Sequence, residues 1–220
     1  MHRVRFSKTG NSIWISHLDL MRLLMRAFRR AGLMLKHSQG YSPHPELSIL
    51  LPLSVGVSSG CELADFELAE GCEASAGEIP ELLNPVLPEG IRVLDCYDGG
   101  LKAGKLAWLL ARLTLIYDGG VPEGAAEAIG ELFRRPSLTV EKHGKKGPVE
   151  LDIQPLHKDV AVRRSDDRTL ILETVAAAQN PTLNPLLLAS AVETYLPAYK
   201  PDHTRCHRVE FYDAEMRPFR

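Results

Sequence analysis

Three arginine side chains recur along one predicted helix near the start of the sequence. Arg22, Arg26 and Arg29 fall within a sector of about 60° when successive residues turn by about 100°. Guanidinium groups bind phosphate through paired hydrogen bonds, and a row of them matches the spacing of phosphates along a nucleic acid strand. The pattern predicts an anion-binding helix face. The alternative is a solvated face, because Asp19 can pair with Arg22.

A stiff polar loop follows this helix and reads Gly40-Tyr-Ser-Pro-His-Pro45. Two prolines restrict the backbone on either side of His44, so the loop loses little entropy on binding. Tyr41 could stack on a base, and His44 could donate to a phosphate or transfer a proton. We expect the loop to complete an anion pocket beside the arginines. The alternative is a rigid turn with Tyr41 packed on the core.

The histidines also raise two catalytic alternatives. His17 and His44 are weak candidates for a general acid or base, which would make the protein a metal-free RNA-processing enzyme. A metal site that combines His37 with His17 and Asp19 is disfavoured. His17 and Asp19 are two residues apart on a helix, so their side chains point in different directions. We expect no metal and no cofactor.

The second half of the sequence offers further basic residues. Lys145 and Lys146 lie in a loop with a glycine on each side, which suits contacts to phosphates; the alternative is a solvated hairpin end. Arg205 and Arg208 are three apart in the last predicted strand and therefore face opposite sides. At most one of these two can join a binding surface.

Charge is unevenly distributed along the 220 residues, although the net charge is only −2. Residues 1–45 carry eight Lys or Arg and one acid, whereas residues 46–100 carry eleven acids and one base. The N-terminal segment can therefore attract a polyanion, unless the fold brings the acidic segment alongside it. The four cysteines are too far apart in sequence for a local zinc or iron–sulfur motif.

The first half has the pattern of a β-α-β-β-α-β unit. We expect a strand at 3–7 with Val4 and Phe6 inward, an extended Ile13-Trp14-Ile15, and a helix capped by Ser16 that ends at Gly32. A hairpin follows, with strands at 47–57 and 62–70 joined by a turn at Ser58-Ser59-Gly60. A short helix at 75–87 and a strand at 91–97 complete the unit.

The second half repeats this order without repeating the residues. Strands are expected at 106–117, 138–142, 160–164, 169–175 and 205–212, with helices at 122–135 and 185–196. The predicted fold class is therefore α+β with two tandem ferredoxin-like (βαββαβ) units. One domain spans residues 1–98 and carries the basic helix and the Gly40–Pro45 loop, the other spans 106–220, and residues 99–105 form the linker.

Several motifs together resemble the bacterial radical-SAM-linked protein family, whose function is unknown. The resemblance is dense over residues 3–70 and is thinner around residues 145–153. It rests on Arg3-Val-Arg-Phe-Ser-Lys-Thr-Gly10, Ser16-His-Leu-Asp-Leu-Met-Arg22, Arg26-Ala-Phe-Arg-Arg-Ala-Gly32, Gly40–Pro45, Pro52-Leu-Ser-Val-Gly56, and Lys145-Lys146-Gly147 with Asp152-Ile153. In that family the module stands alone or is attached to a radical S-adenosylmethionine (SAM) protein.

The resemblance implies a partner rather than an activity. The expected function is an RNA-binding accessory protein that holds tRNA or rRNA for a radical SAM enzyme. The element order is also similar to that of tandem ferredoxin-like proteins that process CRISPR RNA, which is an analogy of fold only. A third possibility is a protein-interaction scaffold that docks through the acidic stretch 62–89. With no signal sequence and no long apolar run, we expect a cytoplasmic protein without a membrane span.

Overall fold

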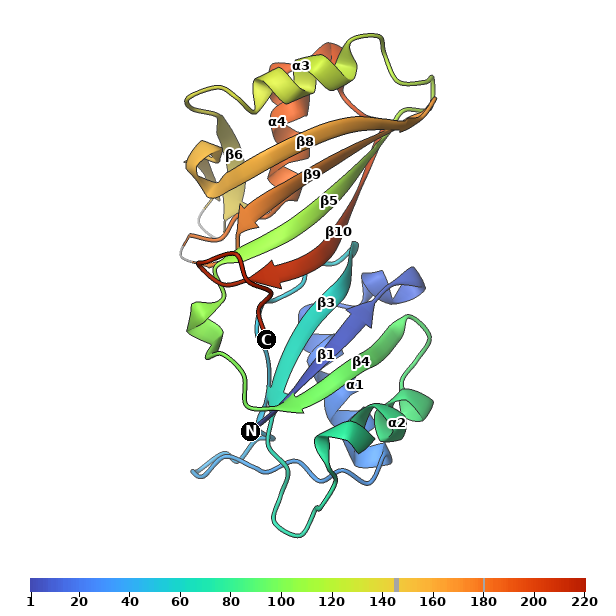
Figure 1. Cartoon of the computed structure of the whole chain (residues 1–220), viewed down its shortest axis with the longest axis vertical. Helices are drawn as coiled ribbons and strands as arrows, with labels where there is room; N and C mark the ends of the chain where they lie inside the picture. Colours follow the sequence, from blue (N-terminus) through green and yellow to red (C-terminus); the bar gives the residue numbers. More distant parts are fainter. Residues whose placement is uncertain (145–146, 180) are drawn as a thin grey trace. The chain divides into compact units, whose positions relative to one another are not determined.

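The computed structural model describes residues 1–144, 147–179 and 181–220 of an α+β protein. The chain divides into two compact units (Figure 1). Unit 1 comprises Met1–Ala103 and Arg220, and unit 2 comprises Gly104–Phe219. Lys145 and Lys146, which were predicted to contact phosphates, lie outside the described residues. Within the described ranges, no helix combines the length and the apolar character that crossing a membrane requires.

Unit 1 has a sheet in which neighbouring strands are antiparallel. The strands run in the order β4-β1-β3, and β2 pairs with β3. Its elements are β1 (His2–Lys8), α1 (His17–Arg30), β2 (Leu47–Ile49), β3 (Val57–Phe66), α2 (Ile79–Leu83) and β4 (Ile91–Asp98). Short 3-10 helices lie at Gly10–Trp14, Ala76–Glu78 and Asn84–Val86.

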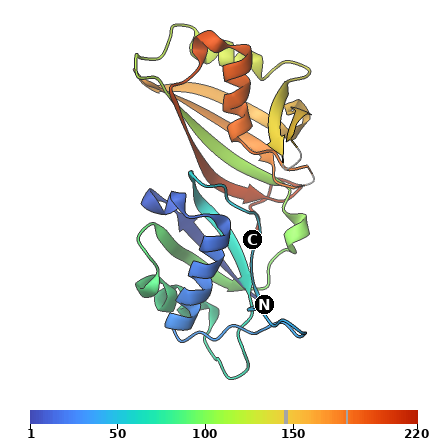
Figure 2. The same ribbon diagram turned by 180° about the vertical axis from the view of Figure 1, so that it is seen from behind.

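Helix α1 forms where the sequence predicts it. The Ser16 hydroxyl accepts the Asp19 backbone N–H at 3.2 Å, and Gly32 follows the helix at φ +75°. The expected apolar stripe, Leu20, Leu24 and Ala27, is buried. It packs with α2 and the strands into one core, and both helices lie on the same side of the sheet (Figure 2).

Two local predictions in unit 1 are wrong. The Ser58-Ser59-Gly60 turn does not exist, because β3 runs straight through these residues. The buried Ser59 hydroxyl accepts the Cys61 backbone N–H at 3.1 Å, so a small polar residue is accommodated inside the strand, and the chain turns earlier at Gly56, with φ +81°. Ile13 and Trp14 belong to a 3-10 helix rather than to a strand.

Unit 2 also has an antiparallel sheet, in the order β10-β5-β9-β8. A separate hairpin of β6 and β7 follows α3 in the chain. The elements are β5 (Trp108–Ile116), α3 (Ala125–Leu132), β6 (Thr139–Gly144), β7 (Gly147–Asp152), β8 (His157–Asp166), β9 (Thr169–Ala177), α4 (Leu186–Tyr195) and β10 (His203–Tyr212). Leucines of β5 and β9 pack with both helices in the core.

His157 is the first residue of β8 and lies in this core. It packs its ring edge-on against Phe133 with centroids 5.5 Å apart. It is only 7% exposed, and neither ring nitrogen has a hydrogen-bond partner in the described part of the chain. Burial lowers the pKa of His157 from 6.5, against a smaller opposing effect of Asp152. The imidazole is therefore held neutral, as the unpaired core position requires.

This burial predicts that unit 2 loses stability as the pH falls through the ordinary histidine range. Below about pH 6.5 the histidine is protonated in the unfolded chain, whereas burial keeps His157 neutral in the folded chain. The free energy of unfolding therefore decreases as the pH is lowered. Urea unfolding between about pH 7.5 and pH 5.5 should show this decrease. The variant His157→Leu should show a smaller one. Part of the decrease should remain in this variant, because burial also lowers the pKa of His207. An identical decrease in variant and wild type would contradict the assignment.

Candidate functional site

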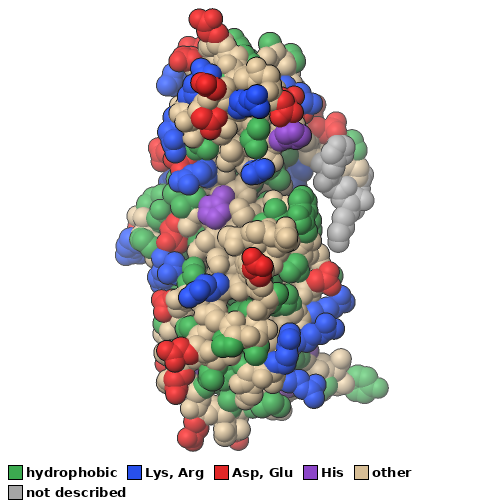
Figure 3. Space-filling model, turned by 90° about the vertical axis from the view of Figure 1, so that its right-hand side faces the viewer, with side chains coloured by type: hydrophobic (Ala, Val, Ile, Leu, Met, Phe, Trp, Pro, Cys, Tyr) green, Lys and Arg blue, Asp and Glu red, His purple; other side chains and the backbone are tan. Residues whose placement is uncertain are grey.

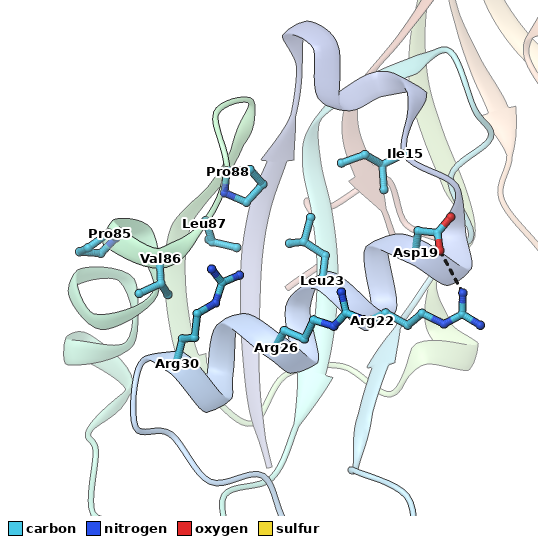
Figure 4. Close-up of a pocket in the computed structure, with 10 residues that line it drawn as sticks. All are labelled: Ile15, Asp19, Arg22, Leu23, Arg26, Arg30, Pro85, Val86, Leu87 and Pro88. Atoms are coloured by element: carbon cyan, nitrogen blue, oxygen red, sulfur yellow. Dashed lines mark hydrogen bonds and ion pairs between the residues drawn. The ribbon is translucent and has the colours of Figure 1, made fainter.

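A hollow of unit 1 runs along α1 and has a volume of about 880 Å³. One wall carries Arg22, Arg26 and Arg30, which follow one another at intervals of four residues (Figure 4). Ile15, Asp19 and Leu23 also line it. The opposite wall is the segment Pro85–Pro88, and the Arg30 side chain extends toward it. We call this hollow the arginine groove.

The arginine groove carries a net positive charge. The Asp19 carboxylate binds the Arg22 guanidinium at 3.0 Å, as the spacing allowed, and hydrogen bonds from Ser16 and Arg22 lower the pKa of Asp19. Within the described residues, no carboxylate lies within 4.0 Å of Arg26 or Arg30. Two of the three guanidiniums are thus exposed without an ion pair, and can bind an anion without first breaking one.

The acidic segment of unit 1 cancels only part of its basic charge, since Asp65 pairs with Arg3 and Glu67 pairs with Lys36. Figure 3 shows Lys and Arg side chains gathered along one edge of unit 1, with acidic side chains mainly along the opposite edge. These ion pairs do not extend to α1, where Arg26 and Arg30 have no carboxylate partner within the described residues. A polyanion approaching the arginine groove meets a favourable local field.

Buried polar contacts fix the turn that leads into α1. The Lys8 side chain is fully buried, and its ammonium group donates to the carbonyls of Ile13 at 2.9 Å and Ile15 at 2.8 Å. The Ser12 hydroxyl donates to the Glu89 carbonyl at 2.7 Å. The turn is therefore tied both to β1 and to the chain just after the Pro85–Pro88 wall.

The Pro85–Pro88 wall is itself held at both ends. At one end the Asn84 side-chain amide donates to the Val93 carbonyl at 3.0 Å, and its oxygen accepts the Val93 N–H at 2.9 Å. At the other end the Thr9 N–H donates to the Gly90 carbonyl at 2.8 Å. Gly90 has φ +86°, and a Cβ there would come within 2.3 Å of the Thr9 oxygen, so glycine is required.

A second, smaller hollow lies beside the first. It has a volume of about 310 Å³, and Arg26 lines both hollows. Arg29, which the sequence analysis placed in one row with Arg22 and Arg26, lines the second hollow and not the first. Arg30 takes its place in the groove, and the four-residue spacing of 22, 26 and 30 was the signal for it in the sequence.

The structure does not bring the two loop residues to the arginines. Tyr41 is fully exposed, so it neither packs on the core nor lines either hollow. The His44 ring lies 2.9 Å from the Ser38 hydroxyl and lines a different hollow, beside Met1. From the Gly40–Pro45 loop, only Pro45 reaches the hollow that Arg26 and Arg29 line.

The other candidates are dispersed. His17, at the start of α1, is half-buried with its Nδ1 atom unpaired, and it does not line the arginine groove. In the described part of the chain, no three His, Cys, Asp or Glu side chains gather as metal ligands. On β10, Arg205 is exposed and Arg208 is buried, in agreement with the predicted opposite orientations.

Comparison with protein families gives one match, which spans residues 2–185 and is described as an uncharacterized protein conserved in bacteria (DUF2344). The chain belongs to the DUF2344 family. The match covers unit 1 except Met1 and Arg220, and it covers unit 2 up to residue 185. A search of curated proteins gives no match.

Solved structures give a distant likeness of fold. A chain of a Cbf5-Nop10-Gar1 complex is 10% identical with a TM-score of 0.52, and the match covers 96% of this chain and 48% of that one. A chain of the archaeal box H/ACA sRNP Nop10-Cbf5 complex is 12% identical with a TM-score of 0.42, and 94% and 46% are covered. The DUF2344 chain thus spans about half the length of these chains.

The buried Lys8 contacts generate a stability prediction. In Lys8→Met the apolar stem is retained, but the carbonyls of Ile13 and Ile15 lose a charged donor. We expect a loss of about 2 kcal/mol in the free energy of unfolding of unit 1, measured by urea denaturation. The matched control is Lys36→Met, whose exposed ammonium pairs with Glu67 at the surface and should matter little. Equal effects of the two substitutions would show that the buried contacts are not needed.

Proposed function

We propose that this DUF2344 protein binds RNA, and that the arginine groove holds the phosphates. The observation that carries the proposal is the row of guanidiniums at four-residue intervals facing an apolar wall. Residues four apart on a helix rise by about 6 Å, a step comparable to that between neighbouring phosphates of an extended strand. The groove is open and elongated rather than enclosed, which suits a chain of phosphates better than a single small anion.

We propose RNA rather than another polyanion because of resemblances to other proteins, not because of the geometry of the groove. The resemblance to radical-SAM-linked proteins implies a partner enzyme of a class that often modifies RNA or ribosomal components. The fold likeness to a chain of the Cbf5-Nop10-Gar1 complex agrees with an RNA ligand, but at 10% identity it concerns the fold alone. The proposed ligands are tRNA or rRNA.

The proposed architecture is two tandem ferredoxin-like units, residues 1–98 and 106–220, joined by residues 99–105. Two strand orders support it. In unit 1 the order is β4-β1-β3 with β2 beside β3, and in unit 2 it is β10-β5-β9-β8 once the β6–β7 hairpin is set aside. Both correspond to fourth, first, third and second strand of a βαββαβ unit.

The proposed role is that of an accessory protein for a radical SAM enzyme. The four cysteines of this chain lie at least ten residues apart, so none forms the closely spaced motif that holds such a cluster. Burial raises the pKa of Cys96 to about 12 and that of Cys206 to about 11, which leaves both as protonated thiols. The radical chemistry would therefore belong to the partner.

Neither alternative has an observation in its favour. For a metal-free RNA-processing enzyme, the general acid or base should face the phosphates, but His17 and His44 are absent from the lining of the arginine groove. For a protein-interaction scaffold, the acidic stretch 62–89 should form one exposed face. Instead its first residues belong to the buried strand β3, where Glu62 and Leu63 are enclosed.

The groove proposal predicts the salt dependence of binding. In Arg26→Ala/Arg30→Ala, two phosphate contacts are lost, so RNA affinity falls. The slope of log K against log salt should become shallower by about 1.4 for a single strand. The measurement is filter binding of total cellular RNA at several salt concentrations.

A matched control removes the same charge elsewhere. Arg163 and Arg205 are exposed in unit 2, and Arg163→Ala/Arg205→Ala should leave the slope within about 0.5 of the wild-type value. Urea unfolding should be unchanged in both double variants, because exposed arginines contribute little to stability. Equal slopes for the groove variant and the wild type would refute the proposal.

The accessory role has its own test, namely affinity purification from the native host with protein and RNA both identified. We expect a radical SAM protein in the eluate, with tRNA or rRNA retained by the wild type and depleted with Arg26→Ala/Arg30→Ala. RNase treatment before elution separates a direct protein contact from one bridged by RNA. An eluate with RNA but no radical enzyme would leave the groove proposal standing and remove the partner.

A further inference from the structure

We infer that the second hollow is a slot for one unpaired nucleobase, so that the RNA bound in the arginine groove is single-stranded at that point. This inference rests on the proposed function and specifies its ligand. The observation behind it is the junction of two chemically different cavities at one side chain, Arg26. We call the second hollow the base slot.

The lining of the base slot is mainly apolar. Its volume of about 310 Å³ lies at the lower end of the roughly 300–1,000 Å³ of small-molecule sites. Five of its residues are apolar, namely Met25, Leu33, Met34, Leu35 and Pro45. Unbranched methionine side chains adapt to a flat ring and make favourable sulfur–aromatic contacts. Such a wall suits an aromatic ring with little bulk.

The polar groups of the base slot come from Arg26, Arg29 and His37. Arg26 and Arg29 both line the slot, and no carboxylate lies within 4.0 Å of either in the described residues. A guanidinium can stack on a base or bind the phosphate that precedes it. His37, whose Nδ1 atom lies 3.1 Å from the Leu35 carbonyl, adds a polar edge that can hydrogen-bond to a base.

The position of Arg26 in both hollows favours a single-stranded RNA over a duplex. With a phosphate on Arg26, the nucleoside attached to it can turn its base from the groove into the adjoining slot. A base inside a duplex is stacked and paired, and extruding it costs a few kcal/mol, whereas a base in a single strand is free to enter. Met34, 55% exposed, is an apolar side chain that a bound base would cover. An unpaired strand therefore satisfies both cavities at once.

The first test needs no variant of the protein. It compares three probes of about twelve nucleotides at one salt concentration: oligouridylate, an abasic strand with the same ribose-phosphate backbone, and a blunt RNA duplex. The abasic strand keeps every phosphate and lacks only the bases. We expect oligouridylate to bind about tenfold more tightly than the abasic strand, near the lower end of the effect of one stacked base. The duplex should bind no better than the abasic strand.

The second test replaces one apolar side chain of the slot with a polar side chain of similar length and the same charge. Met34→Gln should weaken oligouridylate binding severalfold and leave the affinity for the abasic strand unchanged. The matched control is Val149→Gln, an exposed apolar position of β7 outside both hollows, which should alter neither affinity. Met34 is exposed, so urea unfolding of the variant should match that of the wild type.

The outcomes separate the slot from the groove. Equal affinities of oligouridylate and the abasic strand, both sensitive to Arg26→Ala/Arg30→Ala, would overturn the base slot and leave the groove in place. Tightest binding to the duplex would also overturn it. Absence of binding to all three probes would refute the proposed function, and the slot with it.

Discussion

A buried ammonium group fixes the beginning of α1. Lys8 ends β1 inside the protein, where an unpaired charge would be very costly, and its ammonium group donates to the carbonyls of Ile13 and Ile15. That requirement determines the path of the chain between β1 and α1. It helps to fix the place where α1 begins, and the buried stripe of Leu20, Leu24 and Ala27 then leaves Arg22, Arg26 and Arg30 on the outer side of the helix. The position of the arginine groove therefore depends in part on the hydrogen bonds of one buried lysine.

Much of the fold could be predicted from local signals. The cap at Ser16, the stop at Gly32 and the stripe of Leu20, Leu24 and Ala27 are all properties of neighbouring residues. The missed features depend on distant ones. Ser59 looked like a turn residue because its burial within β3 becomes evident only when β1 lies alongside, which the sequence of the segment does not reveal.

The candidate site divides in the same way. One wall, α1, was predicted from the spacing of arginines, although Arg30 was overlooked. The other wall, Pro85–Pro88, lies more than fifty residues further along, and no local pattern links it to α1. The Gly40–Pro45 loop was predicted to join the arginines because it is near in sequence. Yet Tyr41 projects into solvent, and His44 is paired with Ser38 instead.

The two walls of the groove have a consequence for the order of events during synthesis. The arginines of α1 leave the ribosome early, but Pro85–Pro88, and Gly90 that ties it to Thr9, follow some sixty residues later. Until then the chain has a charged helix but no groove. Selective capture of a ligand must therefore wait until unit 1 has closed on itself, and a ligand that binds only the closed form also protects it from unfolding.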